Sequence, residues 1–175
     1  MSFIKIEEKI KKFNKKLTTS GDKSLSIRWA LLASQSAYKS KSYNLLASED
    51  VINTLNCLKK LGVKTKLTKK FCEIHGVGLN GFKYKKNLSL NAGNSGTLGR
   101  LIMGLLVHCK DSIKLKGDKS LSKRDFLRIS KPLEKFGAKF KTNSGKLPIF
   151  IKGTDDPSPI NYNETRGSAQ CKSAV

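Results

Sequence analysis

The chain has 175 residues, of which 38% are hydrophobic and 27% are charged, so it can build a buried core and is not a disordered chain. Its formal net charge is +22, but 30 of the 35 basic residues are lysines scattered along the whole sequence, which indicates a solvated surface more than a nucleic-acid stripe. The sequence contains no apolar run of about 18 residues and no signal-peptide pattern, which excludes a membrane-spanning helix within it and predicts a cytoplasmic protein without a membrane partner.

Hydrophobic periodicity divides the chain into alternating helices and short strands. It predicts helices over residues 26–38, 48–62, 95–108 and 122–136, with Ser48 as an N-cap and with glycines, Gly62 and Gly137, ending two of them. Apolar and β-branched residues predict strands over residues 43–47, 63–67, 71–75, 88–90, 113–115, 138–141 and 147–152. This alternation is typical of an α/β protein.

One segment of the chain recurs. LKKLGVKTKL at 58–67 aligns with LEKFGAKFKT at 133–142, with five of ten positions identical at an offset of 75 residues. The same offset pairs Gly21 with Gly96 and Gly93 with Ser168. We therefore predict a repeated βαβαββ unit: unit one over about 18–85, unit two over about 86–155, and the start of unit three over 156–175. Because a third unit only begins at SAQCKSAV, we expect the chain to be a fragment.

The most specific motif is an octapeptide that occurs twice, as GDKSLSIR at 21–28 and GDKSLSKR at 117–124. The two copies lie 96 residues apart, so a 75-residue duplication does not explain both. Glycine and serine let the backbone approach a ligand closely, and free N–H groups at a helix start favour an anion. The motif, together with the glycine-rich GNSGTLGRL at 93–101, predicts binding of phosphate or carboxylate.

The five arginines of this lysine-rich chain support that prediction. Four of them lie in or beside the motifs, at Arg28, Arg100, Arg124 and Arg128, and Arg166 lies just before GSAQ. Because guanidinium grips phosphate and carboxylate at two points, we expect Arg28 and Arg124 to contact a ligand and Arg128 and Arg166 to be exposed helix residues.

Two other classes of site are not supported. GVGLNG at 76–81 fits GxGxxG, but no apolar helix follows it, which argues against a dinucleotide site. The four cysteines form no CxxC pair, so we expect buried, reduced thiols, no metal site and no cofactor.

GDKSLSIR, GNSGTLGRL, GDKSLSKR, LEKFGA, LP followed by IKG, and SAQCKSAV resemble the 5-enolpyruvylshikimate-3-phosphate (EPSP) synthase family in order and spacing. The resemblance covers nearly all of residues 18–175. It implies transfer of the enolpyruvyl group of phosphoenolpyruvate to the 5-hydroxyl of shikimate 3-phosphate, with release of phosphate, on the route to chorismate and the aromatic amino acids. It also implies small-molecule partners only, with no nucleic acid.

The resemblance implies roles for matching positions. Those for shikimate 3-phosphate are Lys23, Ser24, Arg28, Ser168, Ala169 and Gln170. Those for phosphoenolpyruvate are Lys23, Gly96, Arg124 and Gln170. Lys23 is the implied catalytic residue, through substrate contact and proton traffic. Gly96 implies sensitivity to glyphosate, because a methyl group there would crowd the phosphoenolpyruvate site. Departures from the family pattern at Ser20, Ile27, Leu101 and Ala169 concern loop rigidity and affinity.

The implied fold is most of one lobe of a two-lobed inside-out α/β barrel, built of repeated βαβαββ units. Residues 1–17 would cross from the other lobe, and residues 18–175 would form the incomplete lobe. In the family, the acid/base carboxylates come from the other lobe. We therefore expect this chain to be inactive alone and the complete enzyme to be a monomer.

Three alternatives remain open on sequence grounds. A UDP-N-acetylglucosamine enolpyruvyl transferase shares the architecture but lacks the doubled GDKSLS loop. A basic RNA-binding module would explain the charge, but it calls for aromatic side chains among basic residues on one face, and aromatic residues make up 7% of this chain. The third alternative is a non-catalytic scaffold descended from the enzyme.

Overall fold

The structure is a computed structural model that describes residues 3–5, 7, 12, 14, 16–165 and 167–175. The helices are α1 (Lys23–Ser34), α2 (Glu49–Lys60), α3 (Gly96–Leu105), α4 (Leu127–Glu134) and α5 (Ala169–Ala174), with short 3₁₀ turns η1 (Leu106–His108) and η2 (Leu121–Lys123). The strands are β1 (Lys39–Tyr43), β2 (Lys64–Leu67), β3 (Phe71–His75), β4 (Ser89–Asn91), β5 (Ile113–Lys116), β6 (Lys139–Asn143) and β7 (Lys146–Lys152). None of the described helices is long and apolar enough to cross a bilayer.

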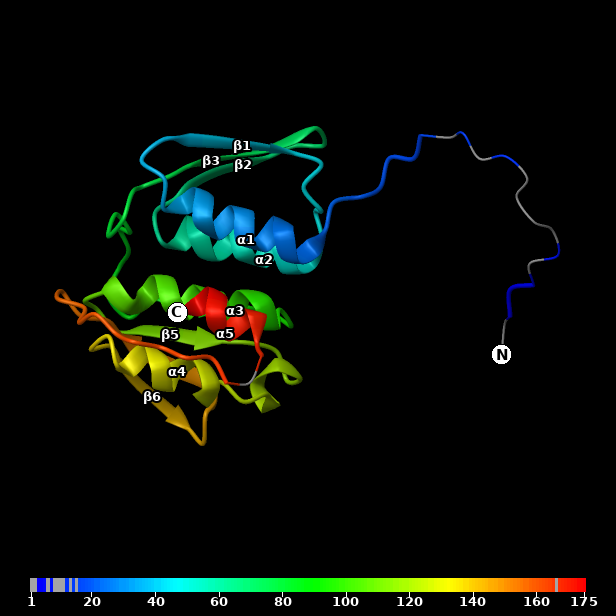
Figure 1. Cartoon of the computed structure of the whole chain (residues 1–175). Helices are drawn as coiled ribbons and strands as arrows, with labels where there is room; N and C mark the ends of the chain where they lie inside the picture. The colour runs from blue at the N-terminus through cyan, green and yellow to red at the C-terminus, as the bar shows by residue number, and fades with distance from the viewer. Residues whose placement is uncertain (1–2, 6, 8–11, 13, 15, 166) are drawn as a thin grey trace.

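The first unit is an antiparallel sheet of order β1-β3-β2 covered on one face by α1 and α2 (Figure 1). On β3, Cys72 and Ile74 are buried toward the helices, whereas Lys39 and Lys41 of β1 face solvent. The alternation of a strand's side chains between two faces explains this division. The sheet of this unit thus has one buried face and one solvent-exposed, basic face.

The second unit is a mixed sheet of order β4-β5-β7-β6, in which β4 and β5 are parallel and the other pairs antiparallel. Its chain order, β4-α3-β5-α4-β6-β7, is the predicted βαβαββ sequence of elements. The first unit has the same order from its first helix onward, and no strand precedes α1 among the described residues.

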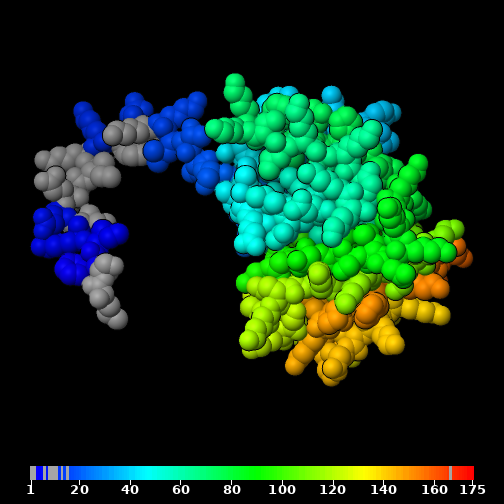
Figure 2. All heavy atoms as spheres, turned by 180° about the vertical axis from the view of Figure 1, so that it is seen from behind, coloured from blue at the N-terminus to red at the C-terminus, as the bar shows by residue number. Residues whose placement is uncertain are grey.

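The two units share an apolar core. Ile27 and Leu58 from the first unit and Leu98, Ile102 and Ile149 from the second are fully buried within one cluster. All four cysteines are free and buried, as predicted. Figure 2 shows the two units stacked on each other, with the described N-terminal residues extending away from them. The predicted crossing segment, residues 1–17, falls largely outside the described residues.

Several predicted boundaries are wrong for identifiable reasons. The helix predicted over 26–38 is α1, which begins three residues earlier because Asp22 caps it. The strand predicted over 43–47 is β1, which begins four residues earlier. Its alternating lysines and serines give no apolar pattern, because its outer face is exposed to solvent. The helix predicted over 122–136 is shorter: η2 closes a single turn, Arg124 is extended, and α4 begins only at Leu127. The helix predicted over 95–108 ends its α-helical part at Leu105 and continues as η1.

Candidate functional site

Three helices begin at the same end of the molecule. In Figure 1, α1, α3 and α5 run in the same direction, so their N-terminal ends lie on one side. Their N-caps are Asp22, Ser95 and Ser168, each 73 residues from the next. The repeat therefore aligns these helix starts at 73 residues, and the predicted pairings of Gly21 with Gly96 and of Gly93 with Ser168 are wrong by two.

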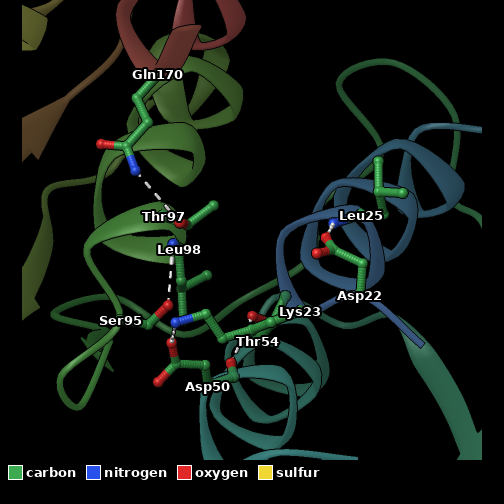
Figure 3. Close-up of polar contacts among 9 residues, drawn as sticks. All are labelled: Asp22, Lys23, Leu25, Asp50, Thr54, Ser95, Thr97, Leu98 and Gln170. Carbon is green, nitrogen blue, oxygen red and sulfur yellow. Dashed lines mark hydrogen bonds and ion pairs between the residues drawn. The ribbon is translucent and has the colours of Figure 1, made fainter. Parts of the chain in front are cut away.

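Each of these caps satisfies a backbone N–H three residues later. Asp22 Oδ1 accepts from the amide of Leu25 at 2.7 Å, Ser95 Oγ from that of Leu98 at 3.2 Å, and Ser168 Oγ from that of Cys171 at 3.3 Å. Figure 3 shows the first two of these bonds. The capped starts of α1 and α3 direct the positive ends of their helix dipoles to this side of the molecule.

The two octapeptide copies fold alike at first and then diverge. Asp118 Oδ1 accepts from the amide of Leu121 at 2.6 Å, as Asp22 does for Leu25, and in both copies the serine four residues after the aspartate donates its amide to the aspartate carbonyl at 3.0 Å. The first copy continues into α1, whereas the second ends after η2. The interpretation of the motif as a helix start is therefore right for one copy only.

The second copy is fastened to the loop before α3. The amide of Asp118 donates to the carbonyl of Gly93 at 2.8 Å. A Cβ on Gly117 would lie 3.0 Å from that same carbonyl oxygen and 2.7 Å from Leu121 Cδ2, so glycine allows the close approach. The structure thus brings GDKSLSKR and GNSGTLGRL side by side.

This junction gathers guanidinium groups at the start of α3. A Cβ on Gly96 would lie 2.9 Å from Arg100 Nη1 and 3.1 Å from Arg124 Nη1. Arg100 is only 6% exposed, and its guanidinium carbon lies 5.2 Å from the centre of the Phe126 ring. Burial lowers the pKa of Arg100, and the neighbouring charges of Arg128 and Arg124 lower it further.

The cluster includes the start of α5. Arg100 Nη1 donates to Gln170 Oε1 at 2.8 Å. Gln170 Nε2 donates in turn to Thr97 Oγ1 at 3.3 Å, as Figure 3 shows. The predicted residues Gly96, Arg124 and Gln170 therefore meet around Arg100. Thr97 and Arg100 were not among the predicted ligands. The spacing of Arg100, four residues after Gly96 in a helix, was the signal that could have placed it on the same face.

The remaining predicted residues lie on α1 and at the start of α5. Arg28 Nη1 donates to Ser173 Oγ, which joins α1 to α5. Lys23 Nζ lies 3.1 Å from Asp50 Oδ2 at the start of α2. Ser24 is half-buried and Ala169 is exposed.

Arg128 and Arg166 were expected to be exposed helix residues. Arg128 is half-buried, its Nε is buried without a hydrogen-bond partner, and its charge acts on Arg100. The expectation of an exposed Arg128 is therefore wrong. Arg166 lies outside the described residues.

Few acids balance the positive charge at this site: Asp50 pairs with Lys23, and the charge of Asp125 acts on Arg100. Within the described residues, Arg28, Arg100, Arg124 and Arg128 form no ion pair with a carboxylate. Guanidinium groups that lack a salt-bridge partner beside a helix N-terminus favour an anionic ligand. The described residues also contain no group of three or more metal-ligating side chains.

A separate hollow lies away from this cluster. It has a volume of about 570 Å³ and is lined by residues that include Tyr84, His108 and Cys109, but by none of the predicted site residues. Burial, followed by a hydrogen bond with Cys109, raises the pKa of Tyr84. The arginine cluster lies outside this hollow, at the start of α3, with Arg100 buried and Arg124 exposed.

Comparisons with known proteins agree with this geometry. The family model for EPSP synthase (3-phosphoshikimate 1-carboxyvinyltransferase) matches residues 7–175. A 3-phosphoshikimate 1-carboxyvinyltransferase from Ruthia magnifica subsp. Calyptogena magnifica is 43% identical over 159 residues, which are 91% of this chain and 36% of the relative. One from Bradyrhizobium diazoefficiens is 40% identical over 163 residues, 91% of this chain and 34% of the relative.

A solved structure shows the same likeness. The EPSP synthase from Acinetobacter baumannii superposes with a TM-score of 0.84 at 35% identity, over 92% of this chain and 37% of that one. The described residues therefore have the fold of part of that enzyme, and the predicted α/β architecture of one lobe is confirmed. The chain spans about a third of the length of the relatives it matches. With a family model matching nearly its whole length, the chain belongs to the EPSP synthase family.

Proposed function

We propose that this chain serves the EPSP synthase reaction, in which phosphoenolpyruvate donates its enolpyruvyl group to the 5-hydroxyl of shikimate 3-phosphate and phosphate is released. The observation that carries the proposal is the cluster of Arg100 and Arg124 against Gly96 at the start of α3, where neither arginine forms a salt bridge with a described residue. Both substrates are small polyanions, which suit such a cluster. The family match favours this reaction over the UDP-N-acetylglucosamine transferase alternative.

The proposed ligand assignments follow the motifs and the geometry. Shikimate 3-phosphate would be held by residues of α1 and the start of α5, which are Lys23, Ser24, Arg28, Ser168, Ala169 and Gln170. Phosphoenolpyruvate would lie against Gly96, with Arg124, Lys23 and Gln170 around it. The geometry adds Arg100 to this second group, because its Nη1 and that of Arg124 approach the same point beside Gly96.

The proposed chemistry uses these cations to stabilise charge. A proton adds to the methylene carbon of phosphoenolpyruvate, the substrate hydroxyl adds to the adjacent carbon and loses its proton, and a tetrahedral intermediate forms. Loss of phosphate and of a methyl proton then gives the enol ether. Preorganised guanidinium and ammonium groups stabilise the phosphate and carboxylate charges throughout, and Lys23 is suited to proton traffic at the hydroxyl.

A binding experiment tests the proposal with the chain as it stands. Shikimate 3-phosphate is titrated into the ¹⁵N-labelled chain, and amide shifts are expected at the starts of α1 and α5. Arg28→Gln should weaken binding at least tenfold, since charge-assisted hydrogen bonds each contribute about 1.5–3 kcal/mol. Absence of binding, or shifts confined to the outer sheet faces, would contradict the proposal.

We also propose that this chain alone does not turn over, because the family's acid/base carboxylates come from the other lobe. Phosphate release from purified residues 1–175 would overturn this. A cytoplasmic location is likewise proposed, supported by the four free, buried cysteines, which suit a reducing compartment.

A further inference from the structure

We propose that Asp50 is a positioning residue that holds the ammonium group of Lys23 over the substrate surface before any ligand arrives. Lys23 Nζ lies 3.1 Å from Asp50 Oδ2 (Figure 3). The Asp50 side chain is 19% exposed and that of Lys23 is 51% exposed, so a largely buried carboxylate anchors a largely exposed cation. The identity of the ligand rests on the proposed function, but the positioning contact does not.

The backbone around Asp50 is held firmly relative to α1. Asp50 lies in the first turn of α2, where the helix dipole favours a carboxylate, and Thr54 Oγ1 donates to its carbonyl at 2.9 Å. Ser26 Oγ of α1 accepts from the amide of Leu46 at 3.1 Å, which ties the segment before α2 to α1. These contacts hold the backbones of α1 and α2 at a set separation, from which the Lys23 side chain reaches the Asp50 carboxylate.

A second close approach fixes the same junction. A Cβ on Gly21 would lie 2.0 Å from the carbonyl oxygen of Asn44 and 2.9 Å from the amide nitrogen of Leu46. Glycine is thus required where the octapeptide meets the segment leading to α2. Lys23, two residues later, starts α1 from this fixed point.

Positioning and simple electrostatics predict opposite signs for one substitution. Asp50→Asn removes a negative charge near the proposed anion site, so electrostatics alone predicts tighter binding of shikimate 3-phosphate. If the carboxylate preorganises Lys23, the variant frees that side chain and binding weakens. Ordering a lysine side chain fully costs a factor of about 30 in an equilibrium constant. We expect a smaller loss, roughly five- to tenfold. The Lys23 side chain is 51% exposed, so Asp50 orders it only in part before the ligand binds.

The chain contains a matched control pair on the outer face of the first sheet. Lys39 Nζ lies 3.6 Å from Glu73 Oε2, and the two side chains are 57% and 17% exposed, close to the values for Lys23 and Asp50. Glu73 Oε1 also lies 3.0 Å from His75 Nε2, which is likewise away from the helix starts. Glu73→Gln removes an equivalent charge away from the helix starts. We expect it to leave the affinity for shikimate 3-phosphate within twofold of wild type.

The experiment has three parts. First, ¹³Cε relaxation in the ligand-free chain should show Lys23 more ordered in wild type than in Asp50→Asn, where it should be as mobile as exposed lysines that form no ion pair. Second, titration of shikimate 3-phosphate, with inorganic phosphate as a second probe, should give the five- to tenfold loss in Asp50→Asn and no loss in Glu73→Gln. Third, in a Lys23→Met background Asp50→Asn should no longer weaken binding, because Asp50 acts through Lys23.

Each outcome decides the proposal. Unchanged Lys23 mobility, tighter binding by Asp50→Asn, or an equal loss in the Lys23→Met background would overturn it. If wild type fails to bind shikimate 3-phosphate, the proposed function fails, while the relaxation measurement still decides the positioning role. Should Asp50→Asn lower the melting temperature by more than about 4 °C, which is roughly 1–2 kcal/mol for a chain of this size, Asp50→Ser repeats the test, since serine is also favoured near helix starts.

Discussion

Two glycines on α3 should respond to alanine in opposite ways, although they lie on one helix. At Gly96 the added methyl group comes too close only to Arg100 Nη1, at 2.9 Å, and Arg124 Nη1, at 3.1 Å, which are the far ends of flexible side chains, while Leu121 Cδ1 at 3.8 Å is in ordinary contact. At Gly104 it meets the backbone, with the carbonyl oxygen of Ala174 at 2.0 Å. The first change therefore displaces two guanidinium groups, and the second must move α5.

The magnitudes follow from these contacts. Alanine in place of glycine stabilises a helix interior by up to about 1 kcal/mol, and overpacking that shifts the backbone costs about 3 kcal/mol. Gly104→Ala should therefore lose about 2 kcal/mol, which lowers the melting temperature by roughly 4–8 °C in a chain of this size. Gly96→Ala should stay within about 1 kcal/mol of wild type.

Binding should show the reverse order. In Gly96→Ala the two guanidinium groups are displaced, and losing even part of the strength of their two charge-assisted contacts should weaken phosphoenolpyruvate binding by about 10–100-fold. The same crowding should weaken the inhibition of the complete enzyme by glyphosate. Thermal unfolding followed by circular dichroism, and titration of phosphoenolpyruvate with shikimate 3-phosphate present, measure both effects. The reasoning is refuted if Gly96→Ala melts as early as Gly104→Ala, or if it binds phosphoenolpyruvate like wild type.

Three further predictions use other features of the chain. Asp118→Ala removes the cap on the Leu121 amide and should cost about 1 kcal/mol in urea unfolding, and an unchanged midpoint would show that the cap is not stabilising. Arg124→Gln should leave the melting temperature unchanged, because the side chain is exposed. It should weaken phosphoenolpyruvate binding at least tenfold, and an affinity equal to that of wild type would remove Arg124 from the site. Burial raises the pKa of the Cys57 thiol from 9.0 to about 11, so the folded state prefers the neutral thiol. The contribution of this thiol to the free energy of unfolding is therefore fully present below pH 9 and is lost as the pH rises toward 11. Urea unfolding between pH 8 and 10.5 should show this loss, and Cys57→Ala should reduce it; identical pH profiles would contradict it.

The repeat and the order of elements could be predicted from sequence because they depend on local signals. Apolar periodicity located α2, and Gly62, with a φ of +88°, ends it as predicted. β1 was misplaced because its lysines and serines give no apolar alternation, and its pairing with β3 comes from tertiary structure. The second octapeptide copy shows the same limit: its letters match the first, but its single 3₁₀ turn gives way to extended backbone at Arg124, and α4 begins only at Leu127.

The candidate site was predictable in its motifs but not in its centre. Scarcity of arginine singled out Arg28 and Arg124 as expected ligand contacts, which stays a prediction, and the structure places Arg124 beside Gly96 and Arg28 against Ser173 of α5. Arg100 was not assigned a ligand, because its burial and its bond to Gln170 depend on α5 lying across α3. No local pattern reveals a contact between residues 70 positions apart. Asp50 was interpreted only as a first-turn acid, and its pairing with Lys23 required the packing of α2 on α1.

The contacts that dock α5 have a thermodynamic consequence. Arg100 holds Gln170 and Arg28 holds Ser173, so two guanidinium groups from separate helices secure the first helix of the third unit. A ligand that recruits either arginine must share it with α5 or replace that bond, so occupancy and docking are linked equilibria. Amide hydrogen exchange in α5 should therefore respond to bound anion far more than exchange in α2 does, which makes this short helix an internal reporter of saturation.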